Sequence, residues 1–194
     1  MGVVLAHESD SDLCPWLPYA KTLADNGYRA FAFDFRGSGS SPPQFAAKAV
    51  RYDLDVEAAA KELRRLGAKK VFLAGASIGG AAVMAASPSV DPQPAGILSF
   101  SGEPELLDAM GSAHATKAPL LVMLARHDGY TSVVSEGRFV RAASSPDKEL
   151  KVYPGAPFII QRLLREGGRD KLKLFELHPT DIKALAGNIA QLEA

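Results

Sequence analysis

The sequence predicts an α/β protein with a doubly wound, mainly parallel sheet of about six strands and helices on both faces. Two features of the chain predict this fold. Short, largely apolar runs alternate along the chain with amphipathic stretches of helical period, and the runs at residues 95–100 and 119–125 are apolar as strands covered on both faces must be. Repeated strand and helix units of this length give a parallel sheet with right-handed crossovers. Ligands of such sheets bind beyond the carboxyl ends of the strands.

The apolar runs give the expected strands, and the amphipathic stretches give the expected helices. Strands are predicted at residues 2–7, 28–35, 70–74, 95–100, 119–125 and 149–153. Helices are predicted at residues 15–27, 52–66, 80–86 and 131–143, with further helical stretches at 157–166 and 179–193 around an alternating run at 171–177. Asn26-Gly27 and Gly67 are residues at which helices commonly end.

Composition favours one domain with a small-molecule ligand. The chain has 194 residues, of which 47% are hydrophobic, and this suits a single domain over residues 1–194. Because the first predicted strand begins at residue 2, we expect no extra edge strands before it. The formal net charge is zero, so no global field attracts nucleic acid or an anionic membrane.

Other sequence features bear on location and cofactors. Cys14 is the only cysteine, which excludes an intrachain disulfide and, with no signal peptide visible, predicts a cytoplasmic protein. No apolar run is long enough to cross a bilayer. The four histidines are scattered, and no phosphate-binding fingerprint follows the first strand. We therefore expect neither a metal site nor a cofactor.

A serine lies on a sharp turn between a strand and a helix. Gly75-Ala76-Ser77-Ile78-Gly79 follows an apolar run and precedes a stretch of small residues. This is the layout of a nucleophile elbow, which lifts a serine hydroxyl above the strand ends. Gly75 and Gly79 would let the strand and the helix approach closely, because neither has a side chain.

Several segments together resemble the α/β-hydrolase family. The resemblance covers roughly residues 2–154, and its motifs follow the family's order. They are the apolar strand ending in His7, the loop Asp34-x-Arg36-Gly37-x-Gly39-x-Ser41, the elbow around Ser77, and Arg126-His127-Asp128-Gly129.

The resemblance implies a serine hydrolase that cuts an ester, thioester or related acyl bond through an acyl-enzyme. Ser77 is then the nucleophile, and the N–H of Ile78 is one donor of the oxyanion hole. The second donor would be the backbone of Glu8 or Ser9, although many relatives have glycine where this chain has Glu8. Asp128 matches the position of the catalytic acid. The alternative for Asp128 is a loop carboxylate that caps the following helix.

The catalytic histidine is the weakest part of the resemblance. In similar proteins the histidine follows a Tyr-Pro-Gly loop, whereas here the matching position after Tyr153-Pro154-Gly155 is Phe158. A phenyl ring cannot accept the serine proton. His178 is the candidate base if residues 171–177 form the terminal strand, and otherwise it merely precedes a helix. The alternative function is therefore an impaired α/β-hydrolase-like protein that binds an apolar ligand or a protein partner.

The remaining candidates are assigned by the family pattern. His7, Trp16 and Phe158 are expected to line the substrate pocket, with His7 also shaping the oxyanion loop and Trp16 equally suited to the core. Asp34 and Arg36 are expected to be structural, and His114 and His127 to face solvent. Glu103 is an alternative candidate for the catalytic acid, but the sequence favours Asp128 for this role. Residues 101–118 are too short for a helical cap, which predicts an open site for small acyl groups.

Overall fold

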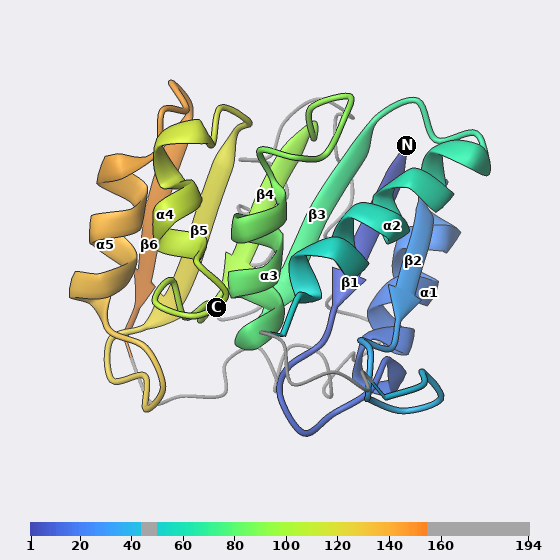
Figure 1. Ribbon diagram of the computed structural model, residues 1–194, viewed down its shortest axis with the longest axis horizontal. Helices are drawn as coiled ribbons and strands as arrows, with labels where there is room; N and C mark the ends of the chain where they lie inside the picture. The colour runs from blue at the N-terminus through green and yellow to red at the C-terminus, as the bar shows by residue number, and fades with distance from the viewer. Residues whose placement is uncertain (44–49, 155–194) are drawn as a thin grey trace.

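The computed structural model describes residues 1–43 and 50–154, and within them one parallel sheet of six strands runs through the molecule (Figure 1). The strand order is β2-β1-β3-β4-β5-β6, and each neighbouring pair is parallel. The strands are β1 (Gly2–Ala6), β2 (Arg29–Phe33), β3 (Val71–Ala76), β4 (Gly96–Phe100), β5 (Leu120–Ala125) and β6 (Lys148–Tyr153).

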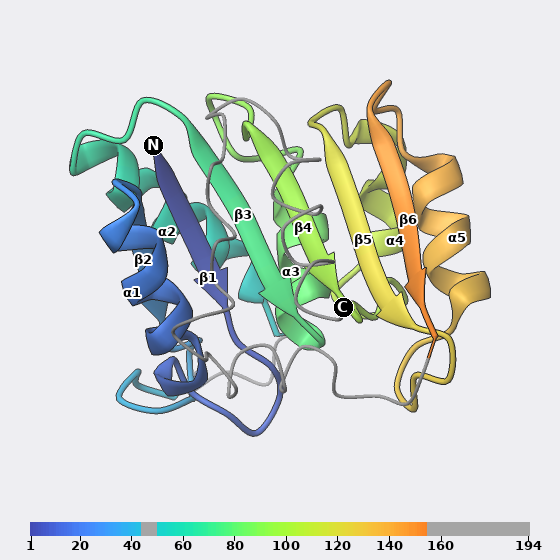
Figure 2. The ribbon, with the colours of Figure 1, turned by 180° about the vertical axis from the view of Figure 1, so that it is seen from behind.

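Helices lie on both faces of this sheet, as Figures 1 and 2 show from opposite sides. One face carries α1 (Leu17–Asp25), which follows a short 3-10 turn, η1 (Cys14–Trp16). The other face carries α2 (Tyr52–Arg65), α3 (Ile78–Ala86), α4 (Ala109–Ser112) with the 3-10 turn η2 (Ala113–Ala115), and α5 (Val133–Ala142). The predicted doubly wound α/β fold is therefore confirmed.

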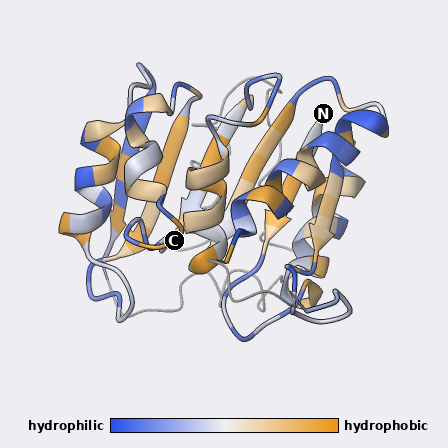
Figure 3. Cartoon of the chain, viewed as in Figure 1, coloured by the Kyte–Doolittle hydropathy of each residue, from blue (hydrophilic) through white to orange (hydrophobic). Residues whose placement is uncertain are grey.

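The two faces of the sheet support two hydrophobic clusters. Along β1, Val4 and Ala6 pack in the cluster that includes α2 and α3, whereas Val3 and Leu5 pack in the cluster that includes α1. Successive strand residues point to opposite faces, so a strand buried on both sides must be apolar at every position. Figure 3 shows this as strands that are coloured hydrophobic along most of their length, beside helices of mixed colour.

The helix predicted at residues 15–27 is divided into η1 and α1. Pro18 has no N–H to donate, so it fits the first turn of a helix and not its interior. The helix predicted from residue 131 begins later, at Val133, because Ser132 caps it: the N–H of Ser135 donates to the Ser132 hydroxyl at 3.0 Å. The stretches predicted at residues 157–166, 171–177 and 179–193 lie outside the described residues.

The strand order reverses between β1 and β3. After β1 the chain adds β2 on one side, and then crosses to add β3 on the other side of β1. In sheets of this kind the crevice for a ligand opens at the carboxyl ends of the strands where the order reverses. This places the ends of β1 and β3, and hence His7 and Ser77, at the position where a site is expected.

Candidate active site

Ser77 stands alone between the end of β3 and the first residue of α3. Its backbone has φ 52° and ψ −121°, a conformation that residues other than glycine rarely adopt. The Ser77 N–H donates to the carbonyl oxygen of Phe100 at 2.9 Å, and the Ala81 N–H donates to the carbonyl oxygen of Ser77 at 3.1 Å. These bonds hold the turn, and they leave the side chain partly exposed at the carboxyl edge of the sheet.

Two glycines allow this turn because the chain passes itself at very short range. A Cβ on Gly75 would overlap the carbonyl oxygen of Gly79. A Cβ on Gly79 would overlap the carbonyl oxygen of Ala6 and lie 2.6 Å from that of His7. The first turn of α3 is thus pressed against the end of β1. The predicted close approach of strand and helix at Gly75 and Gly79 is confirmed.

The same packing brings the proposed oxyanion donors together. Ile78 is the first residue of α3, where backbone N–H groups have no partner within the helix. Glu8 and Ser9 follow His7 directly, and the His7 carbonyl lies against Gly79. The loop after β1 is therefore close to the start of α3, as an oxyanion hole built from both requires. Which N–H group completes the hole stays a prediction.

His7 is a structural residue whose ring nitrogens are both used. The Phe35 N–H donates to Nε2 at 3.1 Å, and Nδ1 donates to the carbonyl oxygen of Glu8 at 2.7 Å. The Nδ1 nitrogen therefore carries the proton. The side chain is only 1% exposed and its ring contacts that of Phe35. His7 thus connects the loops after β1 and β2, and its burial corrects the expectation that it lines an open pocket.

Trp16 also belongs to the core. It is 1% exposed, and its ring centroid lies 6.2 Å from that of Phe100 and 6.0 Å from that of Tyr19. Because η1 turns the indole toward the sheet, Trp16 fills the cluster beneath α1 and does not line an open surface. Phe158, the third residue predicted for the pocket, lies outside the described residues.

Asp34 joins the loops that follow β1 and β2. Its Oδ1 accepts the N–H of Leu13 and its Oδ2 accepts the N–H of Ser40, both at 2.8 Å. These bonds fix the loop that carries the proposed oxyanion donors. The structural role expected for Asp34 agrees with them.

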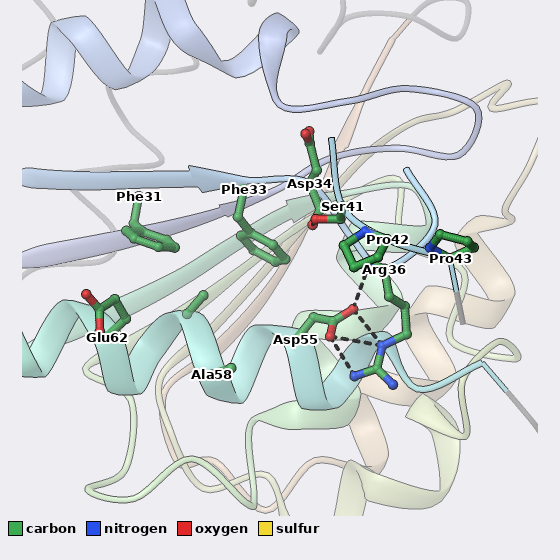
Figure 4. Close-up of a pocket in the computed structure, with 11 residues that line it drawn as sticks. Phe31, Phe33, Asp34, Arg36, Ser41, Pro42, Pro43, Asp55, Ala58 and Glu62 are labelled. Atoms are coloured by element: carbon green, nitrogen blue, oxygen red, sulfur yellow. Dashed lines mark hydrogen bonds and ion pairs between the residues drawn. The ribbon is translucent and has the colours of Figure 1, made fainter. Parts of the chain in front are cut away.

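Arg36 clamps the following loop to α2. Its Nη2 lies 2.6 Å from Oδ1 of Asp55, and this pairing raises the pKa of the guanidinium (Figure 4). The pair borders a groove of roughly 510 Å³ in which Phe31 and Phe33 of β2 face α2. Its described lining comes from β2, the loop after β2 and α2, so the groove is separate from the segments that carry Ser77 and Asp128.

Asp128 follows β5 and organises its own loop. Its Oδ1 accepts the N–H of Tyr130 at 2.9 Å and the N–H of Thr131 at 3.1 Å. The alternative prediction that Asp128 caps α5 is wrong, because Ser132 is the cap. His114 and His127 are exposed, as predicted, and His178 lies outside the described residues.

The direct partner of the Ser77 hydroxyl is Glu103. Ser77 Oγ donates to Glu103 Oε1 at 3.0 Å. The sequence favoured Asp128 as the acid, and it did not indicate a carboxylate in contact with the nucleophile. The signal lies in the pairing of strands: Ala76 is opposite Phe100, so the loops after β3 and β4 begin side by side.

Glu136 is a buried carboxyl close to this part of the site. It lies in the first turn of α5, is fully buried, and forms no hydrogen bond through either oxygen to the residues that the structure describes. Burial, and then the negative charges of Glu105, Asp128 and Glu103, raise its pKa from 4.5 to about 9. Glu136 is therefore neutral at pH 7. Glu105 lies nearby, since its Oε1 accepts the hydroxyl of Ser135.

The sheet, the elbow and the surrounding loops define an α/β-hydrolase. Residues 3–102, just over half of the chain, match the family model described as serine aminopeptidase, S33. The chain belongs to this hydrolase family. No curated protein matches the chain significantly by sequence.

Solved structures share the fold over most of their length. A monoacylglycerol lipase of Paleococcus ferrophilus aligns with a TM-score of 0.71 and 17% identity, over 98% of this chain and 94% of that chain. An esterase of Pyrococcus furiosus aligns with a TM-score of 0.70 and 19% identity, over 90% and 79%. A thermophilic esterase of Thermogutta terrifontis aligns with a TM-score of 0.63 and 16% identity, over 87% and 86%.

The described part of the chain has neither a cluster of metal-ligating side chains nor a membrane-spanning helix. Residues 1–43 and 50–154 contain no group of three or more His, Cys, Asp or Glu side chains suited to holding a metal ion. In the same residues, no helix has both the length and the apolar character needed to span a bilayer.

We expect Gly79→Ala to lower the free energy of unfolding by about 3 kcal/mol, because the added methyl group must displace the backbone of β1. Chemical denaturation measures the change. Gly129→Ala is the matched control, since a Cβ there would meet nothing within 4 Å. Equal unfolding midpoints for the two variants would contradict the close packing at Gly79.

Replacing Glu136 should remove a pH dependence of stability. The folded state holds the proton up to a pKa of about 9, whereas the ordinary value is 4.5. The stabilisation is complete below the ordinary pKa and is lost as the pH rises toward the folded pKa, by about 1.4 kcal/mol per pH unit. Glu136→Met should therefore gain stability over the wild type as the pH is raised from 5 to 8.

Denaturant titrations at several pH values test this expectation. Glu149→Gln, at an exposed glutamate, is the matched control. A constant difference in stability between Glu136→Met and the wild type across the pH range would show that Glu136 is ionised in the folded protein.

Proposed function

We propose that this protein hydrolyses an ester or a related acyl bond through an acyl-enzyme on Ser77. The observation that carries the proposal is the strained turn at Ser77, with φ 52°, at the carboxyl end of β3 and the start of α3. A fold has little reason to keep a non-glycine residue in this conformation unless its side chain is used. Membership of a hydrolase family favours the same activity over a binding role.

In the proposed reaction, Ser77 Oγ attacks the acyl carbon and the carbonyl oxygen becomes negatively charged. The N–H of Ile78 and one N–H from Glu8 or Ser9 would stabilise this charge. A single donor of this kind is typically worth about 10² to 10³ in rate. The alcohol then leaves, and water releases the acyl group from Ser77.

The hydroxyl proton also needs an acceptor. The family's histidine position is Phe158 in this chain, so the candidate base is His178, oriented by Asp128, if residues 171–177 form the terminal strand. Among the residues that the structure describes, the group bonded to the hydroxyl is Glu103.

The proposed substrate carries a short acyl group. Between β4 and β5 the chain forms only α4 and η2, which together are seven residues long. A site to which the segment between β4 and β5 adds so little cover suits small or protruding acyl groups better than long buried chains. The names of the structural relatives, a monoacylglycerol lipase and two esterases, support an ester as the bond that is cut. We place the activity in the cytoplasm, in agreement with the free thiol of Cys14.

Labelling with a fluorophosphonate probe tests Ser77. We expect stoichiometric labelling of the wild type and none of Ser77→Ala, with hydrolysis of p-nitrophenyl acetate and butyrate reduced by about 10³-fold or more in the variant. Ser89→Ala, at an exposed serine in the turn after α3, is the matched control. A folded wild-type protein that remains unlabelled for hours would overturn the proposal.

A further inference from the structure

We propose that Glu103 is a catalytic residue that takes the proton of Ser77 directly, so that the two residues act as a serine–carboxylate dyad. The inference rests on the proposed hydrolase function, and it assigns the proton transfer to a different residue from the histidine of the family resemblance. Its basis is the 3.0 Å hydrogen bond between Ser77 Oγ and Glu103 Oε1.

The backbone around Glu103 is fixed on both sides. Ser101, the first residue after β4, has φ 45°, and its N–H donates to the carbonyl oxygen of Met123 at 2.7 Å. The Leu106 N–H donates to the carbonyl oxygen of Glu103 at 2.8 Å and closes a turn. A carboxylate on such a turn is positioned before substrate arrives, which is what an efficient proton acceptor needs.

Gly102 brings this turn against the helix that starts at the nucleophile. A Cβ on Gly102 would overlap the hydroxyl of Ser99 and lie 2.9 Å from the terminal methyl group of Met84 in α3. Glycine fits there because it has no side chain, and the loop after β4 packs closely against α3. The backbone therefore places Glu103 beside the elbow, and its side chain makes the contact with Ser77.

The direction of the hydrogen bond is fixed by chemistry. An ionised carboxylate only accepts, whereas a serine hydroxyl has one hydrogen to donate. The hydroxyl hydrogen therefore points to Oε1, and the Oγ lone pairs remain available for attack. A hydroxyl that donates to Glu103 is not donating to an imidazole at the same time. Within residues 1–43 and 50–154, His7 uses both ring nitrogens elsewhere, and His114 and His127 are exposed.

The charges close to Glu103 include no positive partner among the described residues. No lysine, arginine or histidine of the described segments forms an ion pair with Glu103. Glu136 in α5 is a carboxyl near Glu103, because the charge of Glu103 contributes to the raised pKa of Glu136. Glu103 is therefore not engaged by a cation of the described segments, and its carboxylate is bonded to the Ser77 hydroxyl.

In the proposed acylation step, the proton moves from Ser77 Oγ to Glu103 Oε1 as Oγ bonds to the acyl carbon. The electron pair of the carbonyl bond moves to the oxygen. When the tetrahedral intermediate collapses, that pair re-forms the carbonyl bond, the bond to the alcohol oxygen breaks, and Glu103 returns its proton to the leaving alcohol. In deacylation, water attacks the acyl carbon and gives its proton to Glu103. When the second tetrahedral intermediate collapses, the bond between the acyl carbon and Ser77 Oγ breaks, and Glu103 returns the proton to Oγ.

The test compares Glu103→Gln with Glu105→Gln. Glutamine has the same shape as glutamate but is not a base, so we expect Glu103→Gln to lower kcat and the rate of fluorophosphonate labelling by about 10²-fold or more, with KM little changed. Glu105 is on the same loop and accepts from Ser135 instead of Ser77, so Glu105→Gln should behave as the wild type. Circular dichroism and thermal denaturation confirm that both variants fold.

A second measurement replaces the missing base chemically. Formate added to Glu103→Ala should restore part of the labelling rate, because it supplies the missing carboxylate.

Each outcome decides between the two proposals. Slow labelling of Glu103→Gln, together with partial rescue of Glu103→Ala by formate, supports the dyad. If Glu103→Gln labels at the wild-type rate, or if His178→Gln abolishes labelling, the dyad is overturned and the proposed function stands. If the wild type is never labelled at Ser77, the proposed function fails and the dyad fails with it.

Discussion

The contact between the first turn of α3 and the ends of β1 and β3 is the constraint on which the site depends. The carbonyl groups of Ala6, His7 and Gly79 occupy the space where side chains of Gly79 and Gly75 would otherwise stand. With strand and helix this close, the residue between them has no room for an ordinary backbone conformation, and Ser77 takes φ 52°. The turn at Ser77, the proposed nucleophile, and the N–H groups at the start of α3 thus depend on the same backbone packing.

Local sequence patterns were sufficient for the fold and for this turn. The hydrophobic patterns of the strands and helices extend over only a few residues each and can be read locally. The glycines around Ser77 indicate a close approach of strand and helix, which few other arrangements require. The ends of elements were harder to predict, because side-chain bonds decide them. The Ser132 side chain, and not that of Asp128, accepts a free N–H of the first turn of α5. Pro18, in the first turn of α1, has no N–H with which to continue a helix from η1.

The partners of the candidate site could not be predicted in the same way, because they depend on which loops meet in space. Glu103 reaches Ser77 across a separation of 26 residues, through the pairing of β3 with β4. Trp16 follows the loop after β1 in the sequence, which suited a pocket residue, but its side chain is buried in the core. The same holds for His7, because residue type alone does not reveal that its Nε2 accepts a hydrogen bond from the N–H of Phe35.

The carboxylate of Asp34 joins two loops that are distant in sequence by hydrogen bonds to both. One carboxylate oxygen secures Leu13 and the other secures Ser40, so a displacement of either loop is transmitted to the other. Substitutions in residues 36–43 should consequently change the position of the loop after β1, which carries the proposed oxyanion donors. In directed evolution, this segment is therefore a place where substitutions outside the candidate site could alter the rate of the proposed reaction.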